Sequence, residues 1–80
     1  MTRGLLEETV IDIIKEVTNN NKVDINDSIE LFDLDSLDKD YVVHLTEQEF
    51  RFAEKKAVWG EFWLNAITLV DLCNFIEERI

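Results

Sequence analysis

The sequence predicts an all-α protein, a small bundle of three or four helices with a long loop between helices 1 and 2. Apolar residues recur at helical spacing in several segments, strand-like alternation is absent, and the chain contains no proline. Its 80 residues, 46% of them hydrophobic, suit one compact globular unit. We therefore expect a single domain spanning residues 1–80.

The first helix is expected over residues 4–17. Its apolar residues follow the i, i+4, i+7, i+8 pattern of one helix face: Leu6, Val10, Ile13, Ile14 and Val17. The TNNN stretch at 18–21 ends it, because asparagine prefers turns and caps to helix interiors. Residues 22–35 show no long helical period, so they predict a long ordered loop with one short helical turn. Such loops in small domains are often functional.

The second helix is expected over residues 36–51. Asp35 is suited to cap its first turn, and Asp38 favours the positive end of the helix dipole. The aromatic-rich segment 51–67 predicts a short third helix with a turn near Gly60.

The last helix is the most clearly marked element. Thr68 and Asp71 have the spacing of a capping box. A single apolar stripe follows, made of Leu69, Leu72, Cys73, Ile76 and Ile80.

The net charge of −10 limits the partners of this chain. Nucleic acids and anionic membrane surfaces would repel it, whereas basic protein surfaces would be attracted at range. No apolar stretch approaches membrane-span length, and Glu7, Glu8 and Asp12 interrupt the apolar run near the N-terminus. One cysteine allows no internal disulfide. We expect a cytoplasmic protein without stable membrane association.

Catalytic and metal sites find little support in the sequence. An EF-hand starting at Asp24 would place Ile29 where the loop needs glycine and Asp35 where it needs glutamate. Ser36 and His44 lie eight residues apart, which on one helix separates them by roughly 12 Å, too far for a nucleophile and its base. One cysteine and one histidine cannot form a zinc cluster. We expect neither an enzyme nor a metal site.

Five aromatic residues cluster around the third helix: Phe50, Phe52, Trp59, Phe62 and Trp63. We expect most of them in the core, with one possible exposed member. Cys73, on the apolar stripe, is expected to be a small buried hydrophobe.

The centre of the chain resembles the acyl carrier protein family. Asp35, Ser36 and Leu37 form the D-S-L core motif, and the run DSLDKDYVVHLTEQEF matches the family's DSL helix without a gap. The closing TLVDLCNFIEERI is similar to the family's last helix. The resemblance implies that Ser36 is the attachment site of 4′-phosphopantetheine, a covalent group derived from coenzyme A, with Asp35 and Leu37 as its neighbours. Ser36 should then face outward and Leu37 inward.

The same resemblance implies a monomeric carrier in fatty-acid, polyketide or related biosynthesis, which presents acyl thioesters to other enzymes. Its partners would be a phosphopantetheinyl transferase and acyl-transferring or condensing enzymes with basic docking surfaces. The partner-binding residues would lie on the second helix: Asp38, Asp40, Tyr41, Glu47 and Glu49. We expect the loop residues Leu31, Phe32 and Leu34 to anchor it to the bundle.

Several departures from the family pattern favour a specialised carrier. Leu34 directly precedes Asp35, where the family usually has a glycine-containing stretch. Tyr41 stands at a helix position that is often acidic in the family, and Thr46 stands at one that is often leucine. The segment between Phe50 and Thr68 is longer and more aromatic than usual. An aminoacyl or peptidyl carrier, and an unmodified helical interaction module on the same fold, remain alternatives.

Overall fold

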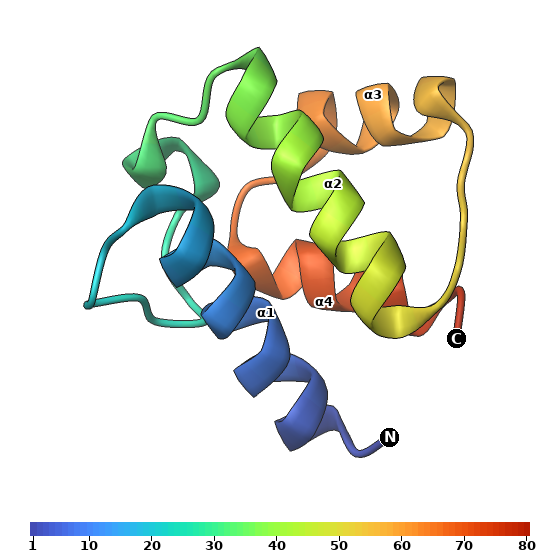
Figure 1. Cartoon of the computed structure of the whole chain (residues 1–80), viewed down its shortest axis with the longest axis horizontal. Coiled ribbons are helices and arrows are strands. Elements are labelled where there is room, and N and C mark those ends of the chain that lie inside the picture. The colour runs from blue at the N-terminus through green and yellow to red at the C-terminus, as the bar shows by residue number, and fades with distance from the viewer.

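A computed structural model describes the whole chain, Met1 to Ile80, as an all-α fold (Figure 1). It contains four α-helices and one short 3₁₀ helix: α1 (Arg3–Thr18), η1 (Ile29–Phe32), α2 (Ser36–Phe50), α3 (Lys56–Asn65) and α4 (Leu69–Glu77). The predicted bundle with a long loop between the first two α-helices is therefore confirmed. None of these helices has both the length and the apolar character needed to cross a membrane.

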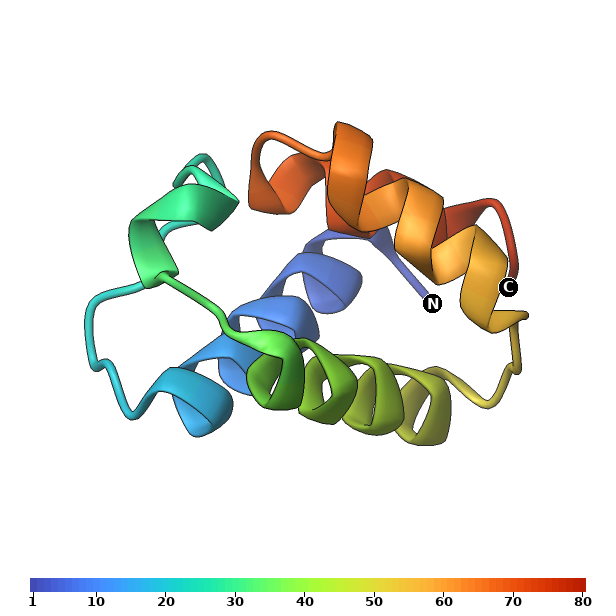
Figure 2. The same cartoon turned by 90° about the horizontal axis from the view of Figure 1, so that it is seen from above.

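The helices surround one core. α1 packs against both α2 and α4, and α3 runs along the other side of the molecule from α1, joined to α2 by the extended residues 52–55 (Figures 1 and 2). The buried apolar residues come from all four α-helices and the loop: Leu6, Val10, Ile13, Ile14, Ile29, Val42, Phe50, Trp59, Leu69, Leu72, Cys73 and Ile76. The apolar stripes predicted for the first and last helices thus face this core, except at Ile80. Ile80 lies beyond the end of α4 and is half exposed.

The long loop is held to the bundle by backbone hydrogen bonds. The N–H of Ile29 donates to the carbonyl oxygen of Ile67 at 2.9 Å, and the N–H of Leu69 donates to that of Asp27 at 3.1 Å. η1 is the short helical turn predicted here, and it buries Ile29. The loop is consequently an ordered part of the fold that leads directly into α2.

Acidic caps set the starts of two helices. At α2 the Asp38 N–H donates to Asp35 Oδ1 at 2.8 Å, and the Asp35 N–H donates to Asp38 Oδ2 at 3.3 Å. At α4 the Asp71 carboxylate accepts the N–H groups of Ile67 and Thr68 at 2.7 and 3.1 Å. Both helices begin at the residues that the capping pattern of the sequence predicts. The caps fix these starts because they satisfy N–H groups that have no partner within the helix.

The predicted turn near Gly60 is wrong. Gly60 lies inside α3, which continues without interruption to Asn65. The chain reverses earlier, where Arg51 adopts the left-handed conformation (φ 58°) and ends α2. Glycine does not break a helix whose neighbouring side chains are packed, and here Trp59 is buried against the core.

Two of the predicted apolar orientations are also wrong. Leu31 and Leu37 are exposed, at 68% and 78%, rather than turned inward. Leu37 precedes the buried Val42 by five residues, which places it about 140° around α2 from the core-facing side. Phe32 and Leu34 do pack against the core and anchor the loop as expected.

Trp59 is the centre of an aromatic cluster between α3 and α4. Its ring centroid lies 4.4 Å from that of Phe75, 5.7 Å from Phe62 and 6.1 Å from Trp63. Trp59 is buried, and Phe52, Phe62 and Trp63 are partly buried against the core. The expectation that these aromatic residues belong mostly to the core is confirmed.

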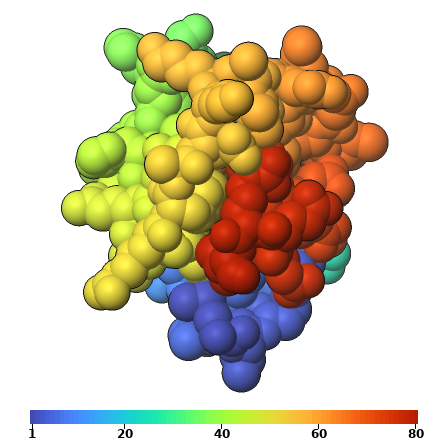
Figure 3. All heavy atoms as spheres, turned by 90° about the vertical axis from the view of Figure 1, so that its right-hand side faces the viewer, coloured from blue at the N-terminus to red at the C-terminus, as the bar shows by residue number.

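The segment that follows α2 lies beside the C-terminal residues, as Figure 3 shows. Arg79 Nε donates to Glu54 Oε2 at 2.8 Å, and the Arg79 guanidinium carbon lies 3.5 Å from the ring centroid of Phe75. The Lys55 N–H, followed by Arg79, holds the pKa of the Glu54 carboxyl below its usual value. This contact fixes residues 52–55 and thereby the start of α3.

Candidate functional site

Ser36 is the first residue of α2, and its side chain is exposed. The capping box runs between the two aspartates that flank it, so the hydroxyl takes no part in that capping. Leu37 beside it is the most exposed large apolar residue of α2. The D-S-L segment thus presents a free hydroxyl and an apolar side chain together at the surface.

A groove separates α2 from α3, and Ser36 lies on its rim. Its volume is about 370 Å³, similar to that of the other surface hollows of the chain. We call it the α2–α3 groove; it is lined by Ser36, Lys39, Asp40, Val43, Glu47, Glu54, Lys56, Trp59, Gly60 and Trp63. Both tryptophans of the chain therefore line the groove that Ser36 borders.

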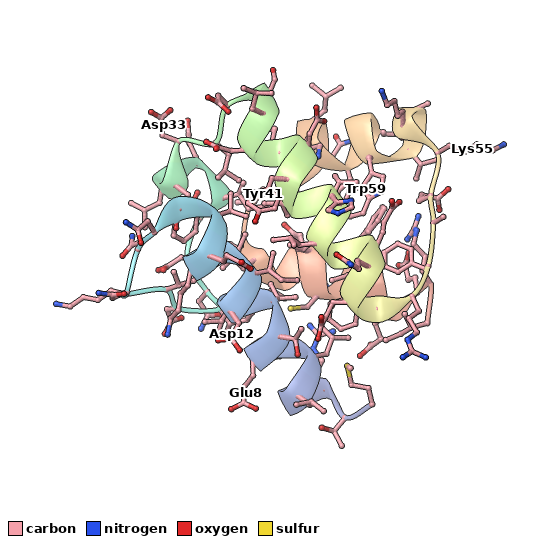
Figure 4. The ribbon with its side chains drawn as sticks, in the orientation of Figure 1. Glu8, Asp12, Asp33, Tyr41, Lys55 and Trp59 are labelled. Carbon is pink, nitrogen blue, oxygen red and sulfur yellow. The ribbon has the colours of Figure 1, made fainter.

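Glu47 holds the two sides of this groove together. Its Oε2 accepts the Trp59 Nε1–H at 3.0 Å and the backbone N–H of Glu54 at 2.8 Å. Trp59 projects from α3 toward α2 (Figure 4). Glu47, predicted as a partner-binding residue, therefore has a structural task that fixes the orientation of the Trp59 ring.

Lys39 and Trp63 lie at the boundary between this groove and a second one. Lys39 Nζ is 5.8 Å from the ring centroid of Trp63, close enough for a cation–π contact. Both residues also line the second groove, of about 420 Å³, which includes Asp33, Leu34 and Ile67. Two hollows thus meet at this contact, near the start of α2.

The five predicted partner-binding residues do not form one surface. Asp40 and Glu47 both line the α2–α3 groove. Helical geometry places Asp38 and Glu49 on the other side of α2, with Tyr41 between the two pairs. Asp40 and Glu49 are exposed, Tyr41 is 44% exposed, and Asp38 and Glu47 are half-buried.

Sequence reasoning missed two exposed apolar residues at and just beyond the end of α3. Leu64 is 86% exposed and Ile67 is 69% exposed, and both line the second groove. The apolar residues of α3 are spread around the helix, so no periodic signal separated Leu64 and Ile67 from their buried neighbours. Only their position at the helix end, revealed by the fold, identifies them as surface.

The remaining polar clusters give no other site. No group of three or more histidine, cysteine, aspartate and glutamate side chains is arranged to hold a metal ion. In the acidic loop Asp24 and Asp27 accept backbone N–H groups of the same loop. Cys73 is fully buried, and this desolvation raises the pKa of its thiol to about 11.

Comparison of the chain with models of protein families, with curated proteins and with solved structures finds no match.

Proposed function

We propose that this protein is a carrier whose Ser36 hydroxyl bears a 4′-phosphopantetheine arm. The observation that carries the proposal is an exposed Ser36 within the D-S-L segment, at the start of a capped helix and on the rim of a tryptophan-lined groove. An exposed hydroxyl is accessible to a modifying transferase. The groove beside it offers apolar surface to whatever the arm carries.

The residues at this helix start fit a phosphodiester. The first N–H groups of a helix have no intrahelical partner, and the helix dipole favours negative charge there. Asp35 and Asp38 satisfy one N–H group each, which leaves those of Ser36 and Leu37 at the surface. When attached, the arm supplies a terminal thiol that holds an acyl group as a thioester. The chain itself positions the arm and presents the cargo, while partner enzymes perform the chemistry.

The charge of the chain supports a function in delivery. With 18 acidic and eight basic residues, the protein attracts basic enzyme surfaces. Asp40 and the exposed Leu37 lie within one helical turn of Ser36, so they would contact an enzyme that reaches the hydroxyl. We place this carrier in the cytoplasm, because its single cysteine is buried and no disulfide requires an oxidising compartment.

Intact-protein mass spectrometry tests the proposal. The chain is incubated with coenzyme A and a broad-specificity phosphopantetheinyl transferase, and we expect wild type to gain the mass of one phosphopantetheine. Ser36→Ala should gain nothing. The chain has one other serine, Ser28, so Ser28→Ala is a matched control that should gain the full mass. An unmodified wild type, or equal modification of Ser36→Ala, would overturn the assignment.

One observation favours a second candidate, an unmodified interaction module. Leu37, Leu64 and Ile67 are all strongly exposed, although each is a large apolar residue. Such residues suit contact with another protein. The same mass measurement separates the two functions, because an interaction module requires no modification of Ser36.

A further inference from the structure

We infer that Lys39 is a positioning residue for the arm, and that its ammonium pairs with the phosphodiester that joins 4′-phosphopantetheine to Ser36. This inference rests on the proposed carrier function and adds to it the side chain of this protein that orients the arm.

Lys39 lies within reach of a group attached to Ser36. It follows Ser36 by one helical turn on α2, and side chains at this spacing are neighbours on the helix surface, with about 5–6 Å between their Cβ atoms. Both residues line the α2–α3 groove. A lysine carries its charge at the end of a flexible four-carbon stem, so the ammonium can approach the oxygens of a phosphate bonded to Ser36 Oγ.

The ammonium of Lys39 has no carboxylate partner, although the residue is half-buried. All the ion pairs of the protein involve Arg3 or Arg79. Asp35 and Asp38, which lie close to Lys39 on the same helix, instead accept backbone N–H groups at the start of α2. The positive charge of Lys39 is therefore available to an anion that arrives at this end of the helix.

Trp63 holds this ammonium on the groove side of α2. Lys39 Nζ lies 5.8 Å from the ring centroid of Trp63, which belongs to α3 on the other side of the groove. An ammonium has three N–H donors, so one can face the ring while another binds a phosphate oxygen. Trp63 thus orients the cation over the groove that Ser36 borders, and it does so without neutralising the charge.

The charge around Ser36 explains why a phosphodiester there benefits from a cation. Lys39 is the only lysine or arginine between Lys22 and Arg51, in a stretch that is otherwise rich in aspartate and glutamate. A phosphodiester adds one more negative charge among these carboxylates, and like charges at short distance repel. Lysine binds phosphate as a compact point charge, so Lys39 offsets this repulsion at the point where the arm is attached.

Nuclear magnetic resonance of phosphorus tests the pair, because the modified protein contains a single phosphodiester. Wild type and three variants are modified with coenzyme A and the transferase, and intact mass verifies that each carries the arm. Lys39→Gln removes the ammonium, Lys39→Arg keeps a cation, and Lys56→Gln is the matched control. Lys56 lines the same groove but lies about two helical turns before Trp63 on α3.

In modified wild type the phosphorus signal should be broad at low salt, because a paired phosphodiester tumbles with the protein. It should sharpen at high salt, which screens the pair. Lys39→Gln should give the sharp signal at all salt concentrations, whereas Lys39→Arg and Lys56→Gln should keep the broad one. Before modification, the variants should melt within about 4 °C of wild type, which excludes unfolding as the cause of a sharp signal.

A second measurement observes the ammonium itself in protein made with isotope-labelled lysine. Modification of wild type should protect one lysine ammonium from exchange with water, so that its signal appears in the modified protein and not in the unmodified one. That signal should be missing from modified Lys39→Arg. This comparison decides the question even if the transferase does not accept Lys39→Gln.

Three results would overturn the inference while leaving the carrier function intact. One is a Lys39→Gln protein whose phosphorus signal is as broad as that of wild type. Another is a Lys56→Gln signal as sharp as that of Lys39→Gln, which would assign the effect to the general charge of the groove. The third is a modified wild type that protects no additional ammonium. If wild type gains no arm at all, the proposed function fails, and the inference fails with it.

Discussion

Thr46 carries a polar atom that the fold leaves unsatisfied. The residue is completely buried on the core side of α2, and its Oγ1 has no hydrogen-bond partner. Replacing it by valine keeps the shape and removes the desolvated hydroxyl.

We therefore expect Thr46→Val to raise the free energy of unfolding by about 1 kcal/mol in urea denaturation. Thr18→Val is the matched control. The Thr18 hydroxyl donates to the carbonyl oxygen of Ile14 at 2.7 Å, so its removal should not raise the free energy of unfolding. A destabilised Thr46→Val protein would show that the hydroxyl has a role the structure does not explain.

Cys73 links stability to alkaline pH. Burial raises the pKa of its thiol from 9.0 to about 11, so the folded protein keeps a proton that the unfolded chain releases. Because the folded state binds more protons in this range, stability should be constant below pH 9 and fall between pH 9 and 11, by at most about 1.4 kcal/mol per pH unit. Chemical denaturation at a series of pH values measures this slope. The slope should become shallower in Cys73→Ala; an unchanged slope would assign the effect to other groups.

At the scale of the helices and their connections, the link from α2 to α3 depends on Glu47. One carboxylate oxygen receives both the Trp59 indole N–H and the Glu54 backbone N–H. Hydrogen bonds to a charged group contribute more to the stability of the fold than hydrogen bonds between neutral groups.

Glu47→Gln should consequently lower the free energy of unfolding by about 1–2 kcal/mol and alter the tryptophan emission. The exposed Glu49 is two residues away on the same helix, and Glu49→Gln should change stability by less than about 0.5 kcal/mol. Equal effects in the two variants would contradict a special structural role for Glu47.

The helices differ in how far the sequence predicted them. α1 and α4 were predicted from apolar stripes, and α2 from the Asp35–Asp38 cap, because these are local signals. The division of segment 51–67 was wrong because Gly60 resembles a turn signal and the apolar residues of α3 are spread around the helix. Ser36 was identified as the candidate from its motif. The groove beside it could not be predicted, because it depends on how α3 is placed against α2 by contacts such as Glu47–Trp59.

At the scale of the whole molecule, the negative charge should govern encounter with partners. Electrostatic steering weakens as salt screens the charges, so kcat/KM for modification by a basic transferase should fall as sodium chloride rises. Asp40→Asn, in the α2–α3 groove, should lower kcat/KM at low salt and make the salt dependence less steep. Asp12→Asn removes the same charge from α1, away from this groove (Figure 4). It should leave kcat/KM at low salt and its salt dependence nearly unchanged. A rate that is independent of salt would contradict steering by the acidic surface.

We propose that Ser36 anchors the arm, and this assignment is tested by locating the added mass within the chain. After reaction with coenzyme A and the transferase, the protein is digested with a protease that cleaves before aspartate, because trypsin would leave Ser28 and Ser36 on one peptide. The peptides are then sequenced by tandem mass spectrometry. We predict that the peptide containing Ser36 carries one phosphopantetheine and that the one containing Ser28 carries none. A Ser36 peptide that stays unmodified, with enzyme and coenzyme A in excess, would show that Ser36 is not the attachment site.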